Sequence, residues 1–297
     1  MTKKPLTIKD SMLGLLLAFL LGQLSVFVIS IIGFVICKAL NVPDEAATTF
    51  FQQGLGYLLC SIALNVTFVL VFVFFNKGKD NTITSKTSFK KLAIYILIAI
   101  VAFFCLYPIV ACFQSLLELF NIMPPEPANL QGANLFYAIF SMAILPAICE
   151  ELLFRGLIFK GLKPYGKILS ITLSALLFSL FHISIHQLIY PILFGLLLGV
   201  IMHKENNIIY CIAAHLTNNL ISVLLMYFDI SLTFNHWLYI VLALALLALF
   251  ITLIVVAIKK LGKFDKLPFT KTNKLYLFST LDIMIILWII VNIGGHL

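Results

Sequence analysis

Charged residues are scarce in this 297-residue sequence. They make up 11% of it, against about a quarter in a typical soluble protein, while hydrophobic residues make up 62%. These proportions exclude a soluble globular domain and predict that the whole chain, 1–297, forms a single membrane domain. The net charge of +8 does not indicate a nucleic-acid partner, because the basic residues gather at the ends of apolar segments.

Cysteine motifs are absent as well. The six cysteines show no CxxC spacing, and all lie in or at the ends of apolar segments. This pattern excludes a disulfide framework and a zinc knuckle, and it predicts that most of the cysteines serve in packing.

Long apolar runs are abundant. Eight read as membrane-spanning helices, near 12–37, 54–76, 92–117, 134–159, 168–186, 187–203, 207–228 and 237–258. A ninth run, near 275–294, is interrupted by Asp282 and could either span the membrane or lie in its interface. The predicted fold class is therefore all-α: a polytopic helical bundle of eight transmembrane helices with room for a ninth.

The lysines predict an orientation. If the N-terminus is cytoplasmic, these eight spans place every lysine except Lys38 on the cytoplasmic side, as the positive-inside rule requires. The low arginine content, the many lysine, isoleucine and asparagine residues, and the lack of a targeting segment favour a multi-pass protein of a bacterial plasma membrane.

The single arginine, Arg155, lies inside an apolar run, in the stretch CEELLFRG. Glu151 precedes it by four residues, so the two side chains share a helix face and can form an ion pair. Glu150 is rotated by about 100° from Glu151 and remains available for another role. A purely structural ion pair would leave this second carboxylate unexplained. Pro146, four residues before Glu150, predicts a kink.

Two later apolar runs also carry polar residues at helical spacing. FSLFH places Phe178 and His182 on one face, and HLTNN places His215 and Asn219 on one face. The helical rise puts Glu150, His215 and His182 roughly 15, 16 and 22 Å into the membrane from the nearest lysines. We expect these groups to share a polar cavity, because isolated intramembrane ionisable residues are costly.

This set of groups suits the attack of water on an amide. Glu150 and His182 could activate the water, while His215 and Asn219 could stabilise the oxyanion. No serine pairs with a histidine in these motifs. A cysteine nucleophile, Cys149 or Cys211, is disfavoured because Cys211, His215 and Asn219 on one straight helix cannot converge on a substrate.

A metal stays open as an alternative. No cofactor is predicted, but Glu150, His182 and His215 could bind Zn²⁺ and leave an open position for water. The HExxH spacing is absent, and the three candidate ligands come from three different spans. The sequence does not choose between a metal-bound water and one activated by Glu150 and His182.

The three motifs EExxxR, FxxxH and HxxxN, in this order, resemble those of the CPBP family, the type II CAAX prenyl endopeptidases and bacteriocin-processing Abi proteins. The resemblance covers about 133–228, the predicted catalytic core, and 236–297 is a C-terminal extension without a recognised motif. It implies an intramembrane endopeptidase of glutamate or metal-dependent type. Glu150 and His182 would activate water, His215 and Asn219 would form the oxyanion hole, and Glu151 and Arg155 would organise the site.

The implied substrate is a membrane-associated protein or peptide within the lipid bilayer. The family includes enzymes that trim prenylated CAAX proteins and members linked to peptide maturation, bacteriocin self-immunity and the regulation of membrane sensors. A non-proteolytic scaffold, bacteriocin-immunity or regulatory protein of the same fold is the alternative. A transporter is disfavoured, because repeated halves are not evident in the sequence.

Overall fold

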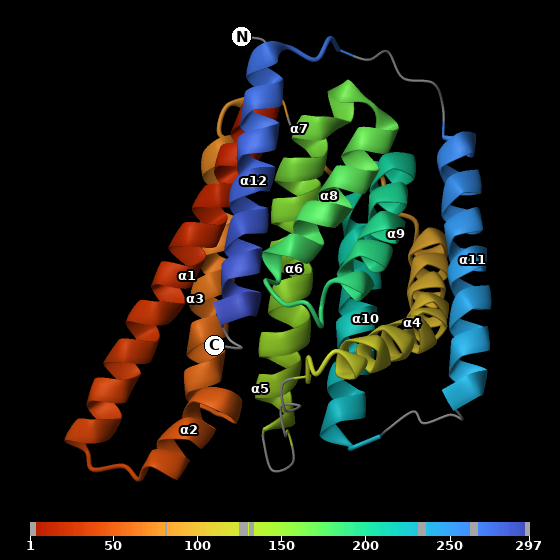
Figure 1. The fold of residues 1–297 in the computed structure, drawn as a ribbon. Coiled ribbons are helices and arrows are strands. Elements are labelled where there is room, and N and C mark those ends of the chain that lie inside the picture. The colour runs from red at the N-terminus through yellow and green to blue at the C-terminus, as the bar shows by residue number, and fades with distance from the viewer. Residues whose placement is uncertain are drawn as a thin grey trace.

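The computed structural model describes residues 4–80, 82–124, 130, 134–230, 236–261 and 267–294. Residue 133, where the predicted core begins, and residues 295–297 lie outside this set. The described chain is a helical bundle, which confirms the predicted fold class (Figure 1). Its α-helices are α1 (Ile8–Ala39), α2 (Asp44–Gln53), α3 (Leu55–Asn76), α4 (Phe89–Leu119), α5 (Leu135–Ile139), α6 (Leu145–Glu151), α7 (Lys160–Leu162), α8 (Lys167–Phe181), α9 (Ile189–Glu205), α10 (Ile208–Tyr227), α11 (His236–Lys260) and α12 (Lys271–Gly294).

Seven segments of the described chain are long and apolar enough to cross a membrane, so the protein is a multi-pass membrane protein. The ninth predicted run, now α12, is one of them. The other six are α1, α2 with α3, α4, the composite helix 135–165, α10, and α11 from Ile240 onward.

The helices α8 and α9 are shorter, with 15 and 17 residues, and they pack against each other as a hairpin. A 15-residue helix is roughly 22 Å long, less than the roughly 30 Å thickness of the hydrocarbon core. Starting from Lys167, α8 therefore ends inside the membrane, and His182 caps that end. Gly195 of α9 permits the close approach, since an added Cβ there would lie 3.1 Å from Ala175.

The composite helix 135–165 contains two π-helical segments, η1 (Phe140–Ile144) and η2 (Leu152–Phe159). Pro146 has no N–H, so it cannot complete the hydrogen-bond ladder through η1. The carbonyl of Ser141 instead accepts a hydrogen bond from the hydroxyl of Ser61 on α3, at 2.8 Å. The chain thus accommodates the proline by a wider helical turn, and α3 satisfies the carbonyl that this turn leaves.

One end of the bundle gathers the lysines, and we call it the lysine-rich end. There β1 (Lys4–Pro5) pairs in parallel with β2 (Lys79–Asp80). A short 3₁₀ turn, Lys163–Tyr165, precedes α8, and Lys167 Nζ donates to the carbonyl of Leu261 at the end of α11. These contacts place the starts of α1 and α8 at the same end as the C-terminal ends of α3 and α11.

The segment 82–88 is hydrogen-bonded to the bundle. The backbone N–H of Ile208 donates to the carbonyl of Ile83 at 2.8 Å, and Asn207 Nδ2 donates to the carbonyl of Ser85 at 2.9 Å. The segment therefore fixes the start of α10, the helix that carries His215 and Asn219.

Candidate active site

The four predicted catalytic side chains lie around one cavity of about 470 Å³. Glu150 comes from α6, His182 from the end of α8, and His215 and Asn219 from α10. The sequence predicted that these three motifs meet, and the structure confirms it. The helix α3 supplies a further wall through Tyr57, Ser61 and Asn65.

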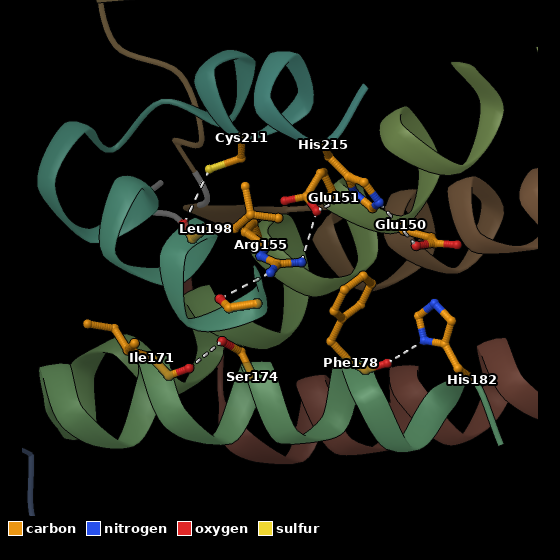
Figure 2. Close-up of polar contacts among 11 residues, drawn as sticks. Glu150, Glu151, Arg155, Ile171, Ser174, Phe178, His182, Leu198, Cys211 and His215 are labelled. Atoms are coloured by element: carbon orange, nitrogen blue, oxygen red, sulfur yellow. Dashed lines mark hydrogen bonds and ion pairs between the residues drawn. The ribbon is translucent and has the colours of Figure 1, made fainter. Parts of the chain in front are cut away.

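Glu151 and Arg155 form the predicted ion pair, and both side chains are completely buried. Arg155 Nη1 donates to Glu151 Oε1 at 2.9 Å, and Nη2 donates to the carbonyl of Gly195 at 3.3 Å (Figure 2). The guanidinium also lies over the ring of Phe178, 4.9 Å from its centre. Arg155 therefore connects its own helix to α8 and α9, beyond the pairing that the sequence predicted.

His215 connects this buried pair to the cavity. Its Nδ1 lies 2.9 Å from Glu151 Oε1, and because the carboxylate accepts, Nδ1 carries the proton. Its Nε2 lies 3.9 Å from Glu150 Oε2. The two glutamates thus face opposite nitrogens of one imidazole, and Glu151 fixes the orientation of that ring.

His182 is held by the backbone of its own helix. Its Nδ1 donates to the carbonyl of Phe178 at 2.8 Å, so Nε2 of the neutral ring keeps its lone pair (Figure 2). The ring of Phe178 contacts both histidines edge to face, at centroid distances of 5.0 Å to His182 and 5.7 Å to His215. Phe178 therefore fixes the spacing between the imidazoles.

Asn219 is oriented by a relay that the sequence analysis missed. The hydroxyl of Tyr190 on α9 donates to Asn218 Oδ1, and Asn218 Nδ2 donates to Asn219 Oδ1 at 3.1 Å. With its carbonyl oxygen engaged, Asn219 presents its NH₂ group, the donor that an oxyanion needs. The two adjacent asparagines in HLTNN were a sequence signal for this relay. No sequence pattern indicated that Tyr190 belongs to it.

The wall from α3 was also missed. Asn65 is 3% exposed, and its Nδ2 donates to the carbonyl of Ser61 at 2.8 Å. Its Oδ1 has no hydrogen-bond partner among the described residues. An asparagine inside an otherwise apolar helix is the signal that could have identified this wall, because amides in a membrane need partners.

The cysteine alternative does not fit the geometry. Cys211 is completely buried, and its thiol points to the carbonyl of Leu198 at 3.5 Å (Figure 2). Neither Cys211 nor Cys149 lines the cavity. Both cysteines pack between helices.

The candidate zinc ligands are Glu150, His182 and His215. Among the described residues, no group of three or more His, Cys, Asp or Glu side chains is placed to hold a metal ion. Glu150, His182 and His215 are therefore not clustered as metal ligands in this structure.

The comparisons with known proteins agree with the motifs. Residues 132–221 match the family of type II CAAX prenyl endopeptidase Rce1-like proteins. The match covers less than a third of the chain and contains the four predicted catalytic residues that line the cavity. No curated protein matches the sequence, and no solved structure does. The resemblance found in the motifs is thus confirmed for this segment, and the chain is a multi-pass membrane protein whose residues 132–221 are similar to type II CAAX prenyl endopeptidase Rce1-like proteins.

Proposed function

We propose that the protein is an intramembrane endopeptidase that hydrolyses a peptide bond in a membrane-associated protein or peptide. The observation that carries the proposal is the common cavity of Glu150, His182, His215 and Asn219, four groups drawn from three helices. Such convergence is costly in a membrane, since each of these groups must be desolvated.

In the proposed reaction a water molecule lies between Glu150 and His182. The carboxylate and the unprotonated Nε2 of His182 are acceptors, so together they withdraw a proton as the water oxygen attacks the scissile carbonyl. The same proton is returned to the leaving amine when the C–N bond breaks. The second proton of the water stays on the attacking oxygen, so the products are a carboxylic acid and an amine, and the two residues are regenerated.

The oxyanion of the tetrahedral intermediate lies between His215 and Asn219. Asn219 offers its NH₂ group, because its carbonyl oxygen is engaged by Asn218. His215 donates through Nε2 when that nitrogen carries a proton, since its Nδ1 is engaged by Glu151. Donors fixed in advance toward a developing charge are worth about 2.7–4 kcal/mol each.

Part of the cavity wall suits an apolar substrate segment. Val26, Leu64, Met142, Val223 and Met226 line the cavity beside its polar groups. We propose that the substrate reaches the site from the bilayer and that the protein resides in a bacterial plasma membrane with its N-terminus in the cytoplasm.

The direct test is cleavage of a library of hydrophobic peptides by the purified full-length protein in liposomes, read by mass spectrometry. Glu150→Gln and His182→Ala should lose the products, whereas Glu118→Gln, at an exposed helix end, should retain them. Equal product from all of the proteins would contradict the proposal and favour the non-proteolytic alternative. A parallel series with a strong chelator tests whether a metal contributes.

A further inference from the structure

A second cavity of about 500 Å³ lies between α4, α9 and α11, and we call it the α4–α9–α11 groove. No residue lines both this groove and the candidate active site. Its walls are apolar except near one end, where Tyr95 and Lys204 line it. Ala102 and Ala257 contribute to the hollow because their side chains are short.

Each of the three wall helices places a lysine on the groove side at the lysine-rich end. Lys204 lines the groove itself. Lys91 lies four residues before Tyr95 on α4, and Lys260 lies three residues after Ala257 on α11, so each shares a helix face with a lining residue. The mouth of the groove is therefore basic on all three walls.

This positive charge is only partly neutralised. Lys91 Nζ pairs with Glu205 Oε2 at 2.6 Å, and the hydroxyl of Tyr95 donates to Glu205 Oε1 at 2.7 Å. Lys204 and Lys260 form no ion pair within the described part of the chain. Three lysines and one carboxylate leave a net charge of two positive units at the mouth.

We propose that the groove binds an anionic phospholipid, with one acyl chain along the apolar walls and the phosphate among Lys91, Lys204 and Lys260. Basic pockets between transmembrane helices bind the head groups of anionic lipids, and a cavity of about 300–1,000 Å³ is typical of small-molecule sites. A peptide does not fit, because its backbone N–H and C=O groups would find almost no partners along these walls.

The bound lipid joins α11 to the rest of the bundle. In Figure 1, α11 lies at the edge of the bundle beside α4, and the groove is between them. A ligand that binds only the folded state stabilises it, so the lipid should raise the unfolding temperature in a saturable manner. This inference is independent of the proposed peptidase activity.

The test uses the purified full-length protein in a neutral detergent, titrated with dioleoyl phosphatidylglycerol or with dioleoyl phosphatidylcholine. Native mass spectrometry counts bound lipids, and thermal unfolding reports the affinity. Phosphatidylglycerol should bind and stabilise, whereas phosphatidylcholine with identical chains should not. Lys204→Gln and Lys260→Gln should each weaken the binding of phosphatidylglycerol about fivefold.

Lys259→Gln is the matched control, since this neighbouring lysine points away from the groove face of α11. Its affinity should equal that of the unaltered protein. Ala257→Phe should fill the groove and abolish saturable binding of phosphatidylglycerol. If this variant does not fold, the three lysine variants still test whether the groove binds the lipid. Equal stabilisation by both lipids, equal loss in Lys259→Gln and Lys260→Gln, or displacement of the lipid by a prenylated peptide would overturn the assignment.

Discussion

At the scale of single residues, two adjacent glutamates have different surroundings. The side chain of Glu151 is completely buried against Arg155, whereas 18% of the Glu150 side chain remains accessible in the cavity. Adjacent helix positions differ by about 100°, so the Glu151 carboxylate can stabilise the fold while the Glu150 carboxylate faces the cavity.

Glu151→Gln should destabilise the protein far more than Glu150→Gln. Removing the Glu151 charge leaves a buried guanidinium without its counter-ion, which costs about 3–5 kcal/mol. Glu150→Gln keeps the shape of a partly accessible side chain, so we expect its unfolding free energy to change by less than about 0.5 kcal/mol. Turnover by Glu150→Gln should fall about 10²–10⁴-fold.

Thermal unfolding of both variants, together with peptide cleavage, checks this contrast. Equal stability of the two variants would contradict the separate assignments of the glutamates. Unchanged turnover by Glu150→Gln would remove Glu150 from the chemistry.

The relay from Tyr190 through Asn218 to Asn219 makes a prediction for kcat. Tyr190→Phe removes the donor that fixes the Asn218 amide, so Asn219 loses its fixed orientation. We expect kcat to fall about tenfold with little change in KM, because the Asn219 amide acts on the intermediate rather than on the bound substrate.

Tyr210→Phe is the matched control for the relay. Its hydroxyl accepts a hydrogen bond from the N–H of Ser88 at the lysine-rich end, at 2.8 Å. Losing this bond should lower stability by about 1 kcal/mol and leave kcat unchanged. If both tyrosine variants lowered kcat alike, the relay would have no specific role.

At the scale of elements, the α8–α9 hairpin places irregular backbone inside the membrane. The loop 183–188 follows His182, and Ile183 has a φ of +49°, which is strained for a β-branched residue. Irregular backbone at this depth persists only where its polar groups have partners. Two flanking helices provide them.

Asn292 of α12 holds one side of this loop. Its Oδ1 accepts from the N–H of Ile185 at 2.8 Å, and its Nδ2 donates to the carbonyl of Ile183 at 3.4 Å. Gln114 of α4 holds the other side, donating to the carbonyl of His186 at 3.0 Å. Both amides lie outside the matched segment 132–221, so flanking helices help to position His182.

Asn292→Ala should therefore lower kcat and loosen the loop. The N–H of Ile185 would lose its partner, at a cost of about 1–3 kcal/mol, and His182 would be less well fixed. Hydrogen exchange over 183–188 should accelerate, and kcat should fall about tenfold. Asn273→Ala, near the start of the same helix, should do neither; exchange unchanged in Asn292→Ala would refute this role for α12.

At the scale of the whole molecule, the apolar runs and the three motifs predicted the bundle and the cavity residues, since hydropathy and helical periodicity are local. The tertiary partners could not be read from the sequence. Gln114 and Asn292 lie in apolar helices, and each hydrogen-bonds a backbone group of the distant loop 183–188, whereas Asn65 donates to a carbonyl of its own helix. A hydrogen bond to backbone leaves no mark on the partner's residue type, so these contacts had no paired signal.

The arrangement of lysines makes the last prediction, on orientation. Contacts such as Lys79 with Asp10 and Lys167 with Leu261 place lysines from distant segments at one end, whereas Lys38 pairs with Asp44 at the other end of α1. Because the lysine-rich side of a membrane protein faces the cytoplasm, Asp44 should face outward.

Labelling with a membrane-impermeant maleimide checks the orientation in intact bacterial cells that express the protein. The variants Asp44→Cys and Lys86→Cys are compared in a Cys37→Ser background, because Cys37 lies close to the same end as Asp44. Position 44 should react in intact cells, and position 86 only after permeabilisation. Both side chains are exposed, and they lie at opposite ends of the bundle. The reverse labelling pattern would invert the topology, so that the lysine-rich end and the basic mouth of the α4–α9–α11 groove would face outward.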